Sequence, residues 1–350
     1  MSSEIGFAIV GVGTIADFHA RALKDVKGGK LVAAFNRSRE KTEAFASKYG
    51  AEAVSSLEVL LGRKDVDVVC VTTPSGSHAE VAIPALDAGK HVFCEKPLEI
   101  QLDRIDAMIA AAQRNQRHLA AVFQSRFGQG ALTLKKAIDA GRFGKLTLCS
   151  AYIKWWRTQS YYDSGAWRGT WELDGGGALM NQGIHAIDLL QFLVGMPCEV
   201  TACTATLAHS KIQVEDTAVA ALKFPHGALG VIEGATSAWP GFLKRIEISG
   251  EHGSAVLEDD RLIFWKFEKE TAEDDAIRAR ASQASTVGGG AADPKAISPE
   301  GHRIQMQDLV DAIREQRPPA ILGEEARKAV QLILAVYESA RSGRTVQIPR

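Results

Sequence analysis

The chain has 350 residues, a formal net charge of −1 at pH 7 and 46% apolar residues. This length permits two domains with separate cores. Lys and Arg (41 residues) balance Asp and Glu (42 residues) without a basic block, which speaks against a nucleic-acid partner. The first residues lack the basic and apolar regions of a signal peptide, and no apolar run is long enough to span a bilayer. We therefore expect a cytoplasmic protein with no membrane partner.

Apolar strands alternate with helical stretches in the first third of the chain. The expected strands are Ile5–Val10, Lys30–Phe35, Val66–Thr72, Lys90–Cys94 and Leu119–Phe123. This spacing is typical of βαβ units, whose strands form a parallel sheet. The sequence therefore predicts an α/β first domain over residues 1–123.

After residue 123 the pattern changes to a helix, a long strand, a second helix and then mostly strands. The expected helices are Ala131–Ala140 and Ala178–Leu193, and the expected strands are Lys145–Trp156, Cys198–Leu207, Thr217–Phe224, Ala228–Thr236, Lys244–Ser249 and Ser254–Glu258. Short connections imply antiparallel neighbours. We predict an α+β second domain over 124–350, with a large, mostly antiparallel open sheet that helices cover on one face. A second subunit is the simplest cover for the other face.

The last part of the chain holds a polar segment and two helices. Thr271–Glu300 is rich in Ala, Gly, Ser and charged residues, and we assign it no structure. Helices near His302–Glu315 and Glu324–Ser342 carry spaced apolar residues, so we expect them to pack back on one of the two sheets, the first domain being one candidate.

A glycine-rich turn follows the first strand and precedes a helix. Gly11 permits the tight turn, and Gly13 lets the backbone approach a pyrophosphate. The helix amides beyond it, those of Thr14 and Ile15 first, favour an anion. Ala16 replaces the third glycine of the dinucleotide fingerprint, which that position tolerates. The alternative is an ordinary strand-to-helix turn.

The second strand ends in Asn36-Arg37-Ser38-Arg39, where an NAD site offers a carboxylate to the ribose. Asn36 can still bond a hydroxyl, while Arg37 or Arg39 can pair with a 2′-phosphate. The sequence therefore favours NADP over NAD without excluding NAD. The alternative is that both arginines are solvated residues at a helix start.

Lys96 and Pro97 follow an apolar strand at the point where a parallel sheet opens onto its ligand. Lys96 is placed to reach a bound molecule, and Pro97 stiffens the exit. Cys94 is a candidate thiol two residues earlier, but a buried, reduced strand cysteine is the commoner case. The five cysteines form no Cys-x-x-Cys pair, and His185 and Asp188 lack a third ligand at convincing spacing, so we expect no metal.

Asn181, His185 and Asp188 fall at i, i+4 and i+7, which predicts one helical face. His185 titrates near neutrality, so it can take a hydroxyl proton while hydride leaves the same carbon for a nicotinamide. Lys96 can bond that oxygen. The run Gly175-Gly-Gly177 allows close approach by a ligand or by another backbone. The alternative is a structural helical histidine.

An aromatic segment precedes these residues. Residues 154–171 hold four of the six tryptophans, together with Arg157 and Arg168. Aromatic faces and forked guanidinium groups suit sugar rings and carboxylates or phosphates, although the same aromatics can serve a packed loop.

The motifs Gly11-Val-Gly13, Glu95-Lys96-Pro97 and Gly175-Gly-Gly177 with His185 and Asp188 resemble the Gfo/Idh/MocA oxidoreductase family over essentially the whole chain. The stretch Trp167 to His185 is most similar to the branch with UDP-sugar-acid 3-dehydrogenases. This resemblance implies an NAD(P)-binding Rossmann domain, a carboxy-terminal α/β domain that oligomerises, as a homodimer or homotetramer, through its sheet, and sugar, cyclitol or nucleotide-sugar substrates.

The resemblance also implies site residues. Lys96 and His185 would be the catalytic pair, and the Lys96–Pro97 bond would be cis. The cofactor would be lined by Thr72, Thr73, Pro74, His78, Glu95 and Lys96. The aromatic loop would lie over the nicotinamide, which favours Tyr162, Trp167 and Arg168 as substrate contacts.

One departure from the family pattern concerns acid–base chemistry. Many members carry Asp where this chain has Asn181, and an amide cannot exchange a proton at working pH. We therefore assign Asn181 to substrate positioning. Two other functions stay open: a glycosidase that uses NAD for transient oxidation, and a non-catalytic sensor that binds cofactor or sugar. The sensor would need neither Lys96 nor His185.

Overall fold

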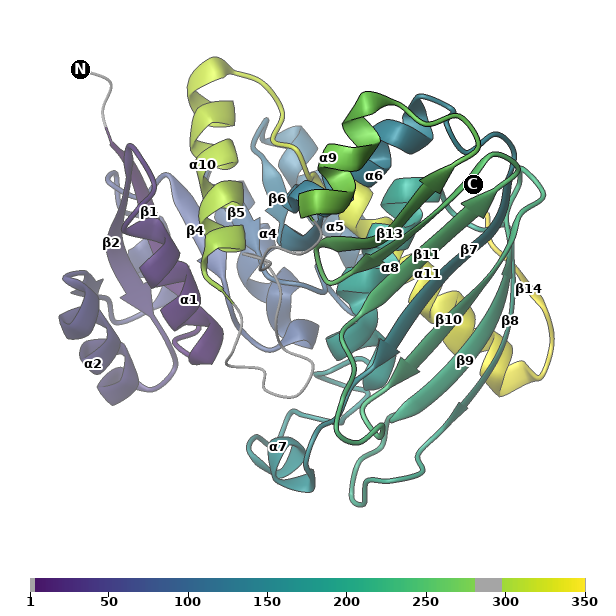
Figure 1. Ribbon diagram of the computed structural model, residues 1–350. Coiled ribbons are helices and arrows are strands. Elements are labelled where there is room, and N and C mark those ends of the chain that lie inside the picture. The colour runs from purple at the N-terminus through teal and green to yellow at the C-terminus, as the bar shows by residue number, and fades with distance from the viewer. Residues whose placement is uncertain (1–3, 281–297, 350) are drawn as a thin grey trace. The chain divides into compact units, whose positions relative to one another are not determined.

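The computed structural model describes residues 4–280 and 298–349. These residues form two compact units. The first comprises the described residues up to Phe123 together with Pro299–Arg327, and the second comprises those from Gln124 to Ser298 together with residues 328–349. Each unit has its own sheet (Figure 1).

The first unit contains the parallel sheet predicted from the alternation of strands and helices. Its strands are β1 (Ile5–Val10), β2 (Gly29–Phe35), β3 (Glu52–Ala53), β4 (Val68–Val71), β5 (His91–Cys94) and β6 (Leu119–Ala121). All neighbours are parallel, in the order β3-β2-β1-β4-β5-β6. The order reverses between β1 and β4, and in such sheets ligands bind outside the strand ends at this point.

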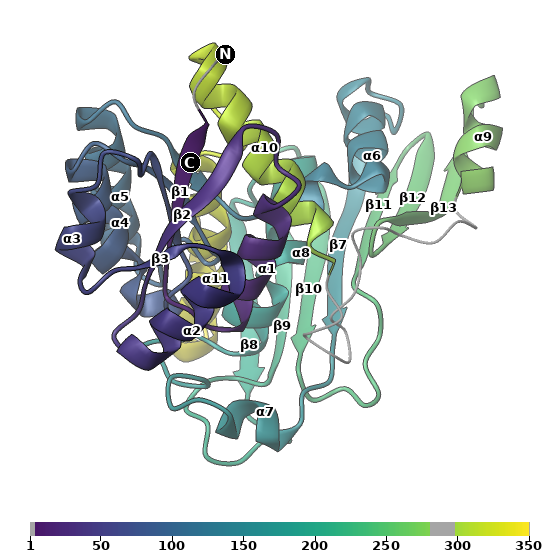
Figure 2. The same cartoon turned by 90° about the vertical axis from the view of Figure 1, so that its left-hand side faces the viewer.

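Helices cover both faces of this sheet. They are α1 (Thr14–Leu23), α2 (Arg39–Tyr49), α3 (Leu57–Leu61), α4 (His78–Asp87), α5 (Leu102–Arg114) and α10 (Glu300–Glu315), with a short 3₁₀ turn at Ser75–Ser77. Figure 2 shows α1 and α10 on one face, with α4 and α5 on the other. Local signals set their ends: Ser38 caps α2, and Gly50 ends it with a positive φ of 70°.

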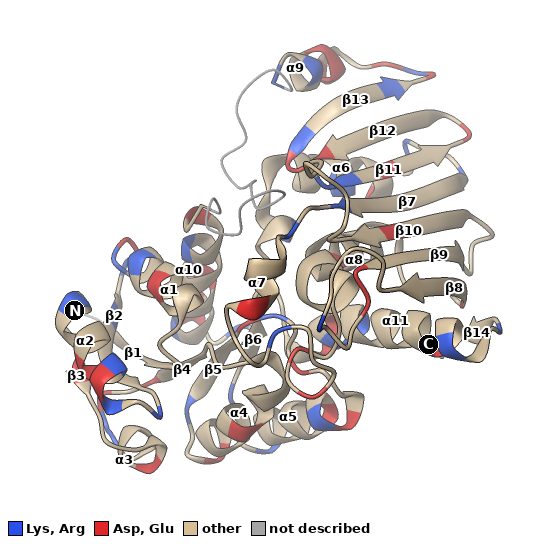
Figure 3. Cartoon of the chain, turned by 90° about the horizontal axis from the view of Figure 1, so that it is seen from below, with Lys and Arg blue, Asp and Glu red and all other residues tan. Residues whose placement is uncertain are grey.

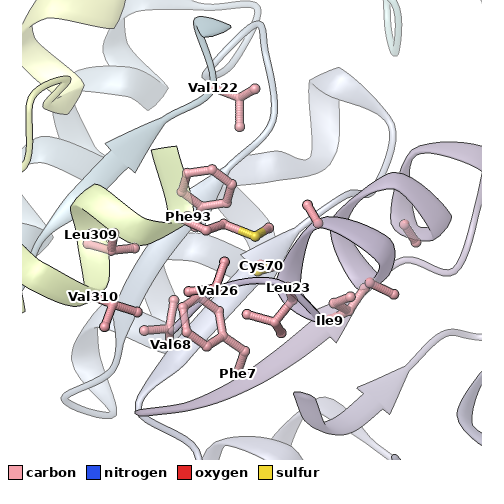
Figure 4. Close-up of a cluster of buried hydrophobic side chains, with 14 of the residues drawn as sticks. Phe7, Ile9, Leu23, Val26, Val68, Cys70, Phe93, Val122, Leu309 and Val310 are labelled. Carbon is pink, nitrogen blue, oxygen red and sulfur yellow. The ribbon is translucent and has the colours of Figure 1, made fainter. Parts of the chain in front are cut away.

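The core of the first unit lies between the sheet and the α1–α10 layer. Phe7, Val68 and Phe93 come from the strands, and Leu309 and Val310 come from α10 (Figure 4). All five are at most 1% exposed. Residues from near the carboxyl end of the chain therefore complete the core that the first strand begins.

The second unit is built on an eight-stranded sheet in the order β13-β12-β11-β7-β10-β9-β8-β14. Its strands are β7 (Leu146–Lys154), β8 (Glu199–Ala205), β9 (Thr217–Lys223), β10 (Leu229–Ala235), β11 (Arg245–Gly250), β12 (Gly253–Glu258), β13 (Arg261–Phe267) and β14 (Val346–Gln347). Only the β7–β10 pair is parallel among these ladders, so the predicted mostly antiparallel sheet is confirmed.

Helical segments of the second unit include α6 (Gln129–Asp139), α7 (Gln159–Asp163), α8 (Ile184–Val194) and α9 (Ala272–Arg280), with a 3₁₀ turn at Gln124–Phe127 and a π-helical segment, η3, at Ala178–Gly183. The last helix, α11 (Gly323–Ser342), begins in the first unit and ends in the second. Helices α6 and α8 pack against strands of the sheet.

The assignment of no structure to Thr271–Glu300 was wrong for its first part. α9 covers Ala272–Arg280, and Asp274 fixes it by accepting hydrogen bonds from Arg142 at 2.8 Å and from the Trp265 indole at 2.6 Å. The polar composition concealed this helix because the buried Asp274, paired with the half-buried Arg142, attaches it together with the single buried apolar residue Ile277. Residues 281–297 of this segment lie outside the described residues. Strand β13 was also not predicted from the sequence.

The open face of the second sheet carries large apolar side chains. Strand β9 alternates buried and exposed positions, with Val219 at 51% exposure. Leu148 and Leu229 are direct partners across β7 and β10, and they are 50% and 56% exposed. Phe264 on β13 is 49% exposed. Helices cover the other face, as predicted.

Charged residues of both signs are interspersed along the chain (Figure 3). Many lie on helices and connecting segments, and their signs alternate over short distances. Within residues 4–280 and 298–349, no helix is both long and apolar enough to cross a membrane.

Candidate active site

The turn after β1 has the geometry that a pyrophosphate-binding turn requires. Gly11 has φ +97°, and a Cβ there would lie 2.8 Å from the Thr72 carbonyl, so a side chain is excluded. A Cβ at Gly13 would meet no atom of the described residues within 4 Å. The protein itself therefore gives no steric reason for Gly13, whereas a ligand close to the backbone gives one.

Helix α1 begins directly after this turn. Thr14 is exposed and Ile15 half-buried. No side chain in the described part of the chain caps the first turn, so its amides are left to bind an anion. We refer to Gly13 and the start of α1 as the cradle, and its role in binding a phosphate group stays a prediction.

The end of β4 lies beside this cradle. Thr72 Oγ1 is 3.0 Å from the Val10 carbonyl and 2.6 Å from that of Gly11, which fastens β4 to the glycine turn. Thr73 Oγ1 is buried and has no hydrogen-bond partner among the residues described. A buried hydroxyl without a partner is costly, so a polar ligand atom at this position would be stabilising. Pro74 leads into the 3₁₀ turn at Ser75–Ser77.

His78 connects the segments that follow β4 and β5. Its ring nitrogens each lie 2.9 Å from a backbone carbonyl, Nε2 from Thr73 and Nδ1 from Pro97. Burial lowers the pKa of His78, while the two carbonyls act in the opposite direction. The Lys96–Pro97 bond is cis, as the resemblance implied.

After β2, the two arginines that the sequence suggested as partners of a 2′-phosphate lie in different environments. The Asn36 amide donates to Thr42 Oγ1 at 3.1 Å, which holds the strand end. Arg39 lies on α2, and its Nε is 2.7 Å from Glu43 Oε1. Arg37 is exposed, and no ion pair of Arg37 occurs within the described ranges. Arg37 is therefore the better candidate.

Lys96 is half-buried and follows β5 at the same sheet edge. The preceding carboxylate, Glu95, turns into the unit: Oε1 lies 2.8 Å from His19 Nε2 and 3.1 Å from His302 Nε2. Oε2 accepts a hydrogen bond from the Lys96 amide at 3.1 Å. The predicted contact of Glu95 with the cofactor stays a prediction, and the two histidines are partners that sequence reasoning missed.

The cysteine next to this motif is structural in character. Cys94 is fully buried, and burial raises the pKa of its thiol well above the ordinary value. The protonated thiol is a poor nucleophile. Cys70 and Cys149 are buried as well, and all five cysteines are free.

A nicotinamide dinucleotide fits these residues. The sheet order brings the ends of β2, β1, β4 and β5 next to one another. The phosphate cradle lies after β1, the ribose-facing positions after β2, the unsatisfied Thr73 hydroxyl after β4 and Lys96 after β5. Asn36, Arg37, Thr72, Pro74 and His78 thus belong to the same edge, although their contacts with a cofactor stay predictions.

In the second unit, the regular helix expected over Ala178–Leu193 was wrong. Residues Ala178–Gly183 form the π-helical η3, and α8 begins only at Ile184. The i, i+4 spacing of Asn181 and His185 therefore does not describe one regular helical face. Wide helical turns of this kind recur at functional sites.

Glu215 holds this wide turn in place. Its carboxylate accepts hydrogen bonds from the amides of Gly177 at 3.0 Å and Leu179 at 2.8 Å, and from the Tyr337 hydroxyl at 2.8 Å. A Cβ at Gly177 would lie 1.9 Å from the Glu215 carbonyl, so this glycine serves close approach of another backbone. Burial raises the pKa of Glu215 to about 7.

Asn181 belongs to a chain of polar contacts. Its amide donates to Asp174, and its Oδ1 accepts from Gln182 Nε2 at 2.6 Å. Gln182 Nε2 also donates to the Tyr161 hydroxyl at 2.7 Å, which accepts from Arg168 at 2.6 Å. Asn181 and Arg168, two predicted substrate residues, are therefore linked through residues that sequence reasoning missed.

His185 lies in the first turn of α8 and is half-buried. Asp188, which shares this helix, is fully buried, and both its oxygens accept hydrogen bonds from Arg126. Asp188 thus has a clear structural partner. The catalytic role of His185 stays a prediction.

The aromatic loop places its predicted residues in two environments. Tyr162 is 5% exposed, and its hydroxyl is 2.8 Å from Thr236 Oγ1. Arg168 stacks over Trp167 and Tyr161, with its guanidinium carbon 4.6 and 4.3 Å from the ring centroids. Arg168 and Trp167 are half-buried. The substrate contacts of Tyr162, Trp167 and Arg168 remain predictions, and Tyr161 joins them as a candidate.

Comparisons with known proteins agree with this arrangement. Residues 5–123 match the model of an oxidoreductase family with an NAD-binding Rossmann fold, and residues 131–256 match the GFO/IDH/MocA C-terminal domain. The chain is 34% identical to the WlbA dehydrogenase from Bordetella pertussis, whose crystal structure contains NADH and UDP-GlcNAcA. The TM-score is 0.91, and the match covers 100% of this chain and 99% of that one.

Curated relatives include two inositol dehydrogenases. Myo-inositol 2-dehydrogenase of Thermotoga maritima is 27% identical over 97% of each chain. Inositol 2-dehydrogenase of Rhizobium meliloti is 29% identical over 73% of this chain and 76% of its own length. The chain belongs to the Gfo/Idh/MocA family of oxidoreductases, whose first domain binds NAD.

Proposed function

We propose that the protein is an NAD(P)-dependent dehydrogenase or reductase that acts on a secondary hydroxyl or ketone of a sugar, cyclitol or nucleotide sugar. The observation that carries the proposal is Lys96, a half-buried cation at the sheet edge that also holds the Gly13 cradle and the unsatisfied Thr73 hydroxyl. A binding protein for dinucleotides would need no cation there.

A nicotinamide dinucleotide held by Gly13, Thr73 and Arg37 would supply the hydride chemistry. In the oxidative direction His185 takes the hydroxyl proton, and in the reductive direction it returns that proton to the oxygen. Lys96 donates a hydrogen bond to the same oxygen and stabilises the negative charge that develops on it. Asn181 positions the substrate because an amide cannot relay a proton.

The side chains of the second unit support a substrate with an anionic group. Arg168 is presented by the rings of Trp167 and Tyr161, and Arg157 is buried with Nε 3.0 Å from Gln182 Oε1. Guanidinium groups suit carboxylates and phosphates. The UDP-GlcNAcA complex of the Bordetella relative supports a nucleotide sugar acid, and the inositol dehydrogenases support cyclitols.

For the cofactor we propose that both NAD(H) and NADP(H) bind, with Arg37 favouring the 2′-phosphate. The exposure of Arg37 after β2 supports NADP. The NADH complex of the Bordetella relative supports NAD.

We further propose a cytoplasmic homo-oligomer, either a dimer or a tetramer. Five free cysteines support a reducing compartment. The exposed Leu148, Val219, Leu229 and Phe264 on one sheet face support contact with a second copy.

The purified protein should be screened with UDP-GlcNAcA, inositols and free sugars, each with NAD and NADP, by nicotinamide absorbance and product mass. Lys96→Met should abolish turnover while the dissociation constant of NADH changes little. Lys64→Met, at an exposed residue, is the control. Undiminished turnover of Lys96→Met would remove Lys96 from the mechanism, and glycoside cleavage without net absorbance change would indicate the glycosidase.

A further inference from the structure

Three side chains from distant parts of the chain meet in the first unit beside Lys96. His19 comes from α1, Glu95 follows β5, and His302 comes from α10. They are 0%, 5% and 2% exposed. Such residues are rarely buried for packing alone, because a polar group loses its water on burial and must find partners. We refer to them as the His–Glu–His group.

Both histidines of the group contact the same carboxylate oxygen. Both Nε2 atoms lie within hydrogen-bond distance of the same oxygen, Glu95 Oε1, at 2.8 Å for His19 and 3.1 Å for His302. Burial lowers the pKa of His19. Burial acts to raise the pKa of Glu95, but the hydrogen bonds with the two histidines outweigh it, so this pKa lies well below its usual range. An ionised Glu95 whose Oε1 accepts from both Nε2 atoms satisfies these conditions.

The same carboxylate reaches the backbone of Lys96. Oε2 of Glu95 accepts a hydrogen bond from the Lys96 amide at 3.1 Å. On the other side of Lys96, the carbonyl of Pro97 lies 2.9 Å from His78 Nδ1. Both neighbours of Lys96 are therefore held by buried histidines, and the peptide that carries the lysine has contacts at both ends.

We propose that His19 and His302 are positioning residues, which hold Glu95 so that its second oxygen fixes the Lys96 amide and directs the lysine side chain towards the reacting oxygen. This inference rests on the role of Lys96 under the proposed function. Under this proposal, two residues of the Glu95-Lys96-Pro97 motif have different roles. Lys96 contacts the reacting oxygen, and Glu95 positions Lys96.

A metal ion is the competing explanation, because the three ligand atoms all lie within 4.8 Å of one another. The separations argue for direct hydrogen bonds. Ligands about 2.0–2.1 Å from a tetrahedral zinc ion lie roughly 3.3 Å apart, whereas His19 Nε2 is 2.8 Å from Glu95 Oε1. Both Nε2 atoms also contact the same oxygen, Glu95 Oε1, which is the arrangement expected of two hydrogen-bond donors.

The first test uses the full chain with UDP-GlcNAcA, or with whichever screened sugar is turned over. His302→Leu removes the donor and keeps apolar volume, while His302→Gln offers an amide donor near the place of Nε2. We expect His302→Leu to lower kcat about tenfold or more, because misplaced catalytic groups cost this much, with KM for NAD changed less than about threefold. His302→Gln should recover most of kcat.

His91→Leu is the matched control. His91 lies at the start of β5 in the same unit, and its Nδ1 accepts from the His118 amide at 3.0 Å instead of contacting Glu95. A loss of kcat in His91→Leu equal to that in His302→Leu would mean that general loosening of the unit explains the effect, which would overturn the proposal.

Combining His302→Leu with Lys96→Met tests whether the histidine acts through the lysine. In single-turnover experiments, which detect a residual rate too slow for steady-state assays, the effect of His302→Leu on that residual rate should vanish once Lys96 is replaced, since coupled residues are not additive. If Lys96→Met alone leaves turnover intact, the proposed function fails. If Lys96→Met abolishes turnover but His302→Leu leaves kcat unchanged, only the positioning inference fails.

A substrate-free measurement completes the design. Competitive acetylation followed by mass spectrometry reports the reactivity of the Lys96 amine in each variant. His302→Leu should change that reactivity severalfold, and His91→Leu and His302→Gln should not. One equivalent of zinc in the purified protein, lost in His302→Leu, would overturn the proposal in favour of a metal site.

Discussion

Arg126 binds both carboxylate oxygens of Asp188, with Nε 2.8 Å from Oδ2 and Nη2 2.6 Å from Oδ1. The two side chains are 5% and 0% exposed. Asp188 lies on α8 one turn after His185, and Arg126 lies in the turn Gln124–Phe127. This bidentate pair therefore anchors the helix that carries His185, which gives Asp188 a structural role.

Removing one charge of this pair should destabilise the protein. Asp188→Asn leaves a buried guanidinium without its counter-charge, and the expected loss in the free energy of unfolding is about 3–5 kcal/mol. Urea unfolding followed by circular dichroism measures it. Glu43→Gln breaks the exposed pair with Arg39 and should cost less than about 1 kcal/mol. A stable Asp188→Asn protein that binds NADH but has lost turnover would instead assign Asp188 to catalysis.

Asn181→Ala should weaken substrate binding more than it changes the pH dependence of kcat. The substitution removes the amide that links Asp174 to Gln182, so we expect KM for the sugar to rise about tenfold, the effect of one lost hydrogen bond to a charged group. Initial rates between pH 6 and 9 provide both quantities, with Asn115→Ala in α5 as control. Loss of an acid limb in the profile of Asn181→Ala would contradict the positioning role.

Glu215 should make stability depend on pH. Its folded-state pKa of about 7 lies above the ordinary 4.5, so the folded protein keeps a proton that the unfolded chain releases. The resulting stabilisation is full below about pH 4.5 and is lost as the pH rises through 7. At about 1.4 kcal/mol per pKa unit, the change is roughly 3 kcal/mol.

Glu215→Gln should remove the contribution of Glu215 to the pH dependence of stability. Unfolding in urea at pH 5 and pH 8 should show a smaller decrease for Glu215→Gln than for the unaltered protein, whereas Glu251→Gln, at an exposed residue, should follow the unaltered protein. Parallel pH curves for all three proteins would show that another group titrates.

Arg37→Ala should lower the preference for NADP over NAD. A guanidinium that pairs with the 2′-phosphate contributes about 1.5–3 kcal/mol, so kcat/KM for NADP should fall roughly tenfold or more while that for NAD stays within about twofold. Arg39→Ala is the matched control, since Arg39 already pairs with Glu43. Equal losses with both cofactors would exclude a 2′-phosphate contact.

Charge on the open sheet face should separate the proposed oligomer. Leu148 and Leu229 are neighbours across β7 and β10, so Leu148→Glu with Leu229→Glu would place two carboxylates at the proposed contact. Light scattering after gel filtration should show monomers. Leu207→Glu, in the segment after β8 where Leu207 is 72% exposed, should leave the oligomer intact, and an unchanged mass for the double variant would exclude this face.

The fold was predictable where periodicity is strong. The strand alternation predicted β1 with its observed bounds and β9 to within one residue. The π-helical segment was not predictable, because it depends on Glu215, which lies 38 residues from Gly177. A wide turn leaves the same apolar pattern in the sequence as a regular helix.

The site was predictable in its motifs and not in its contacts. Gly11, Gly13 and Lys96 follow from local context. The histidine partners of Glu95 could not be predicted in this way. His302 is 207 residues away, and the sequence of an amphipathic helix does not indicate which residue its histidine contacts. Tyr162, not Tyr161, was predicted from the sequence as a substrate contact, but the hydroxyl of Tyr162 contacts the buried Thr236.

Helix α10 gives the first unit a core that the chain completes late. Met306, Leu309 and Val310 belong to the cluster that contains Phe7 and Phe93. During synthesis the ribosome releases the strands of the second unit before these residues appear. The amino-terminal sheet must therefore keep apolar surface uncovered in the nascent chain, a period in which chaperones or aggregation compete for it. A recombinant fragment that stops at Phe123 would retain this exposure permanently.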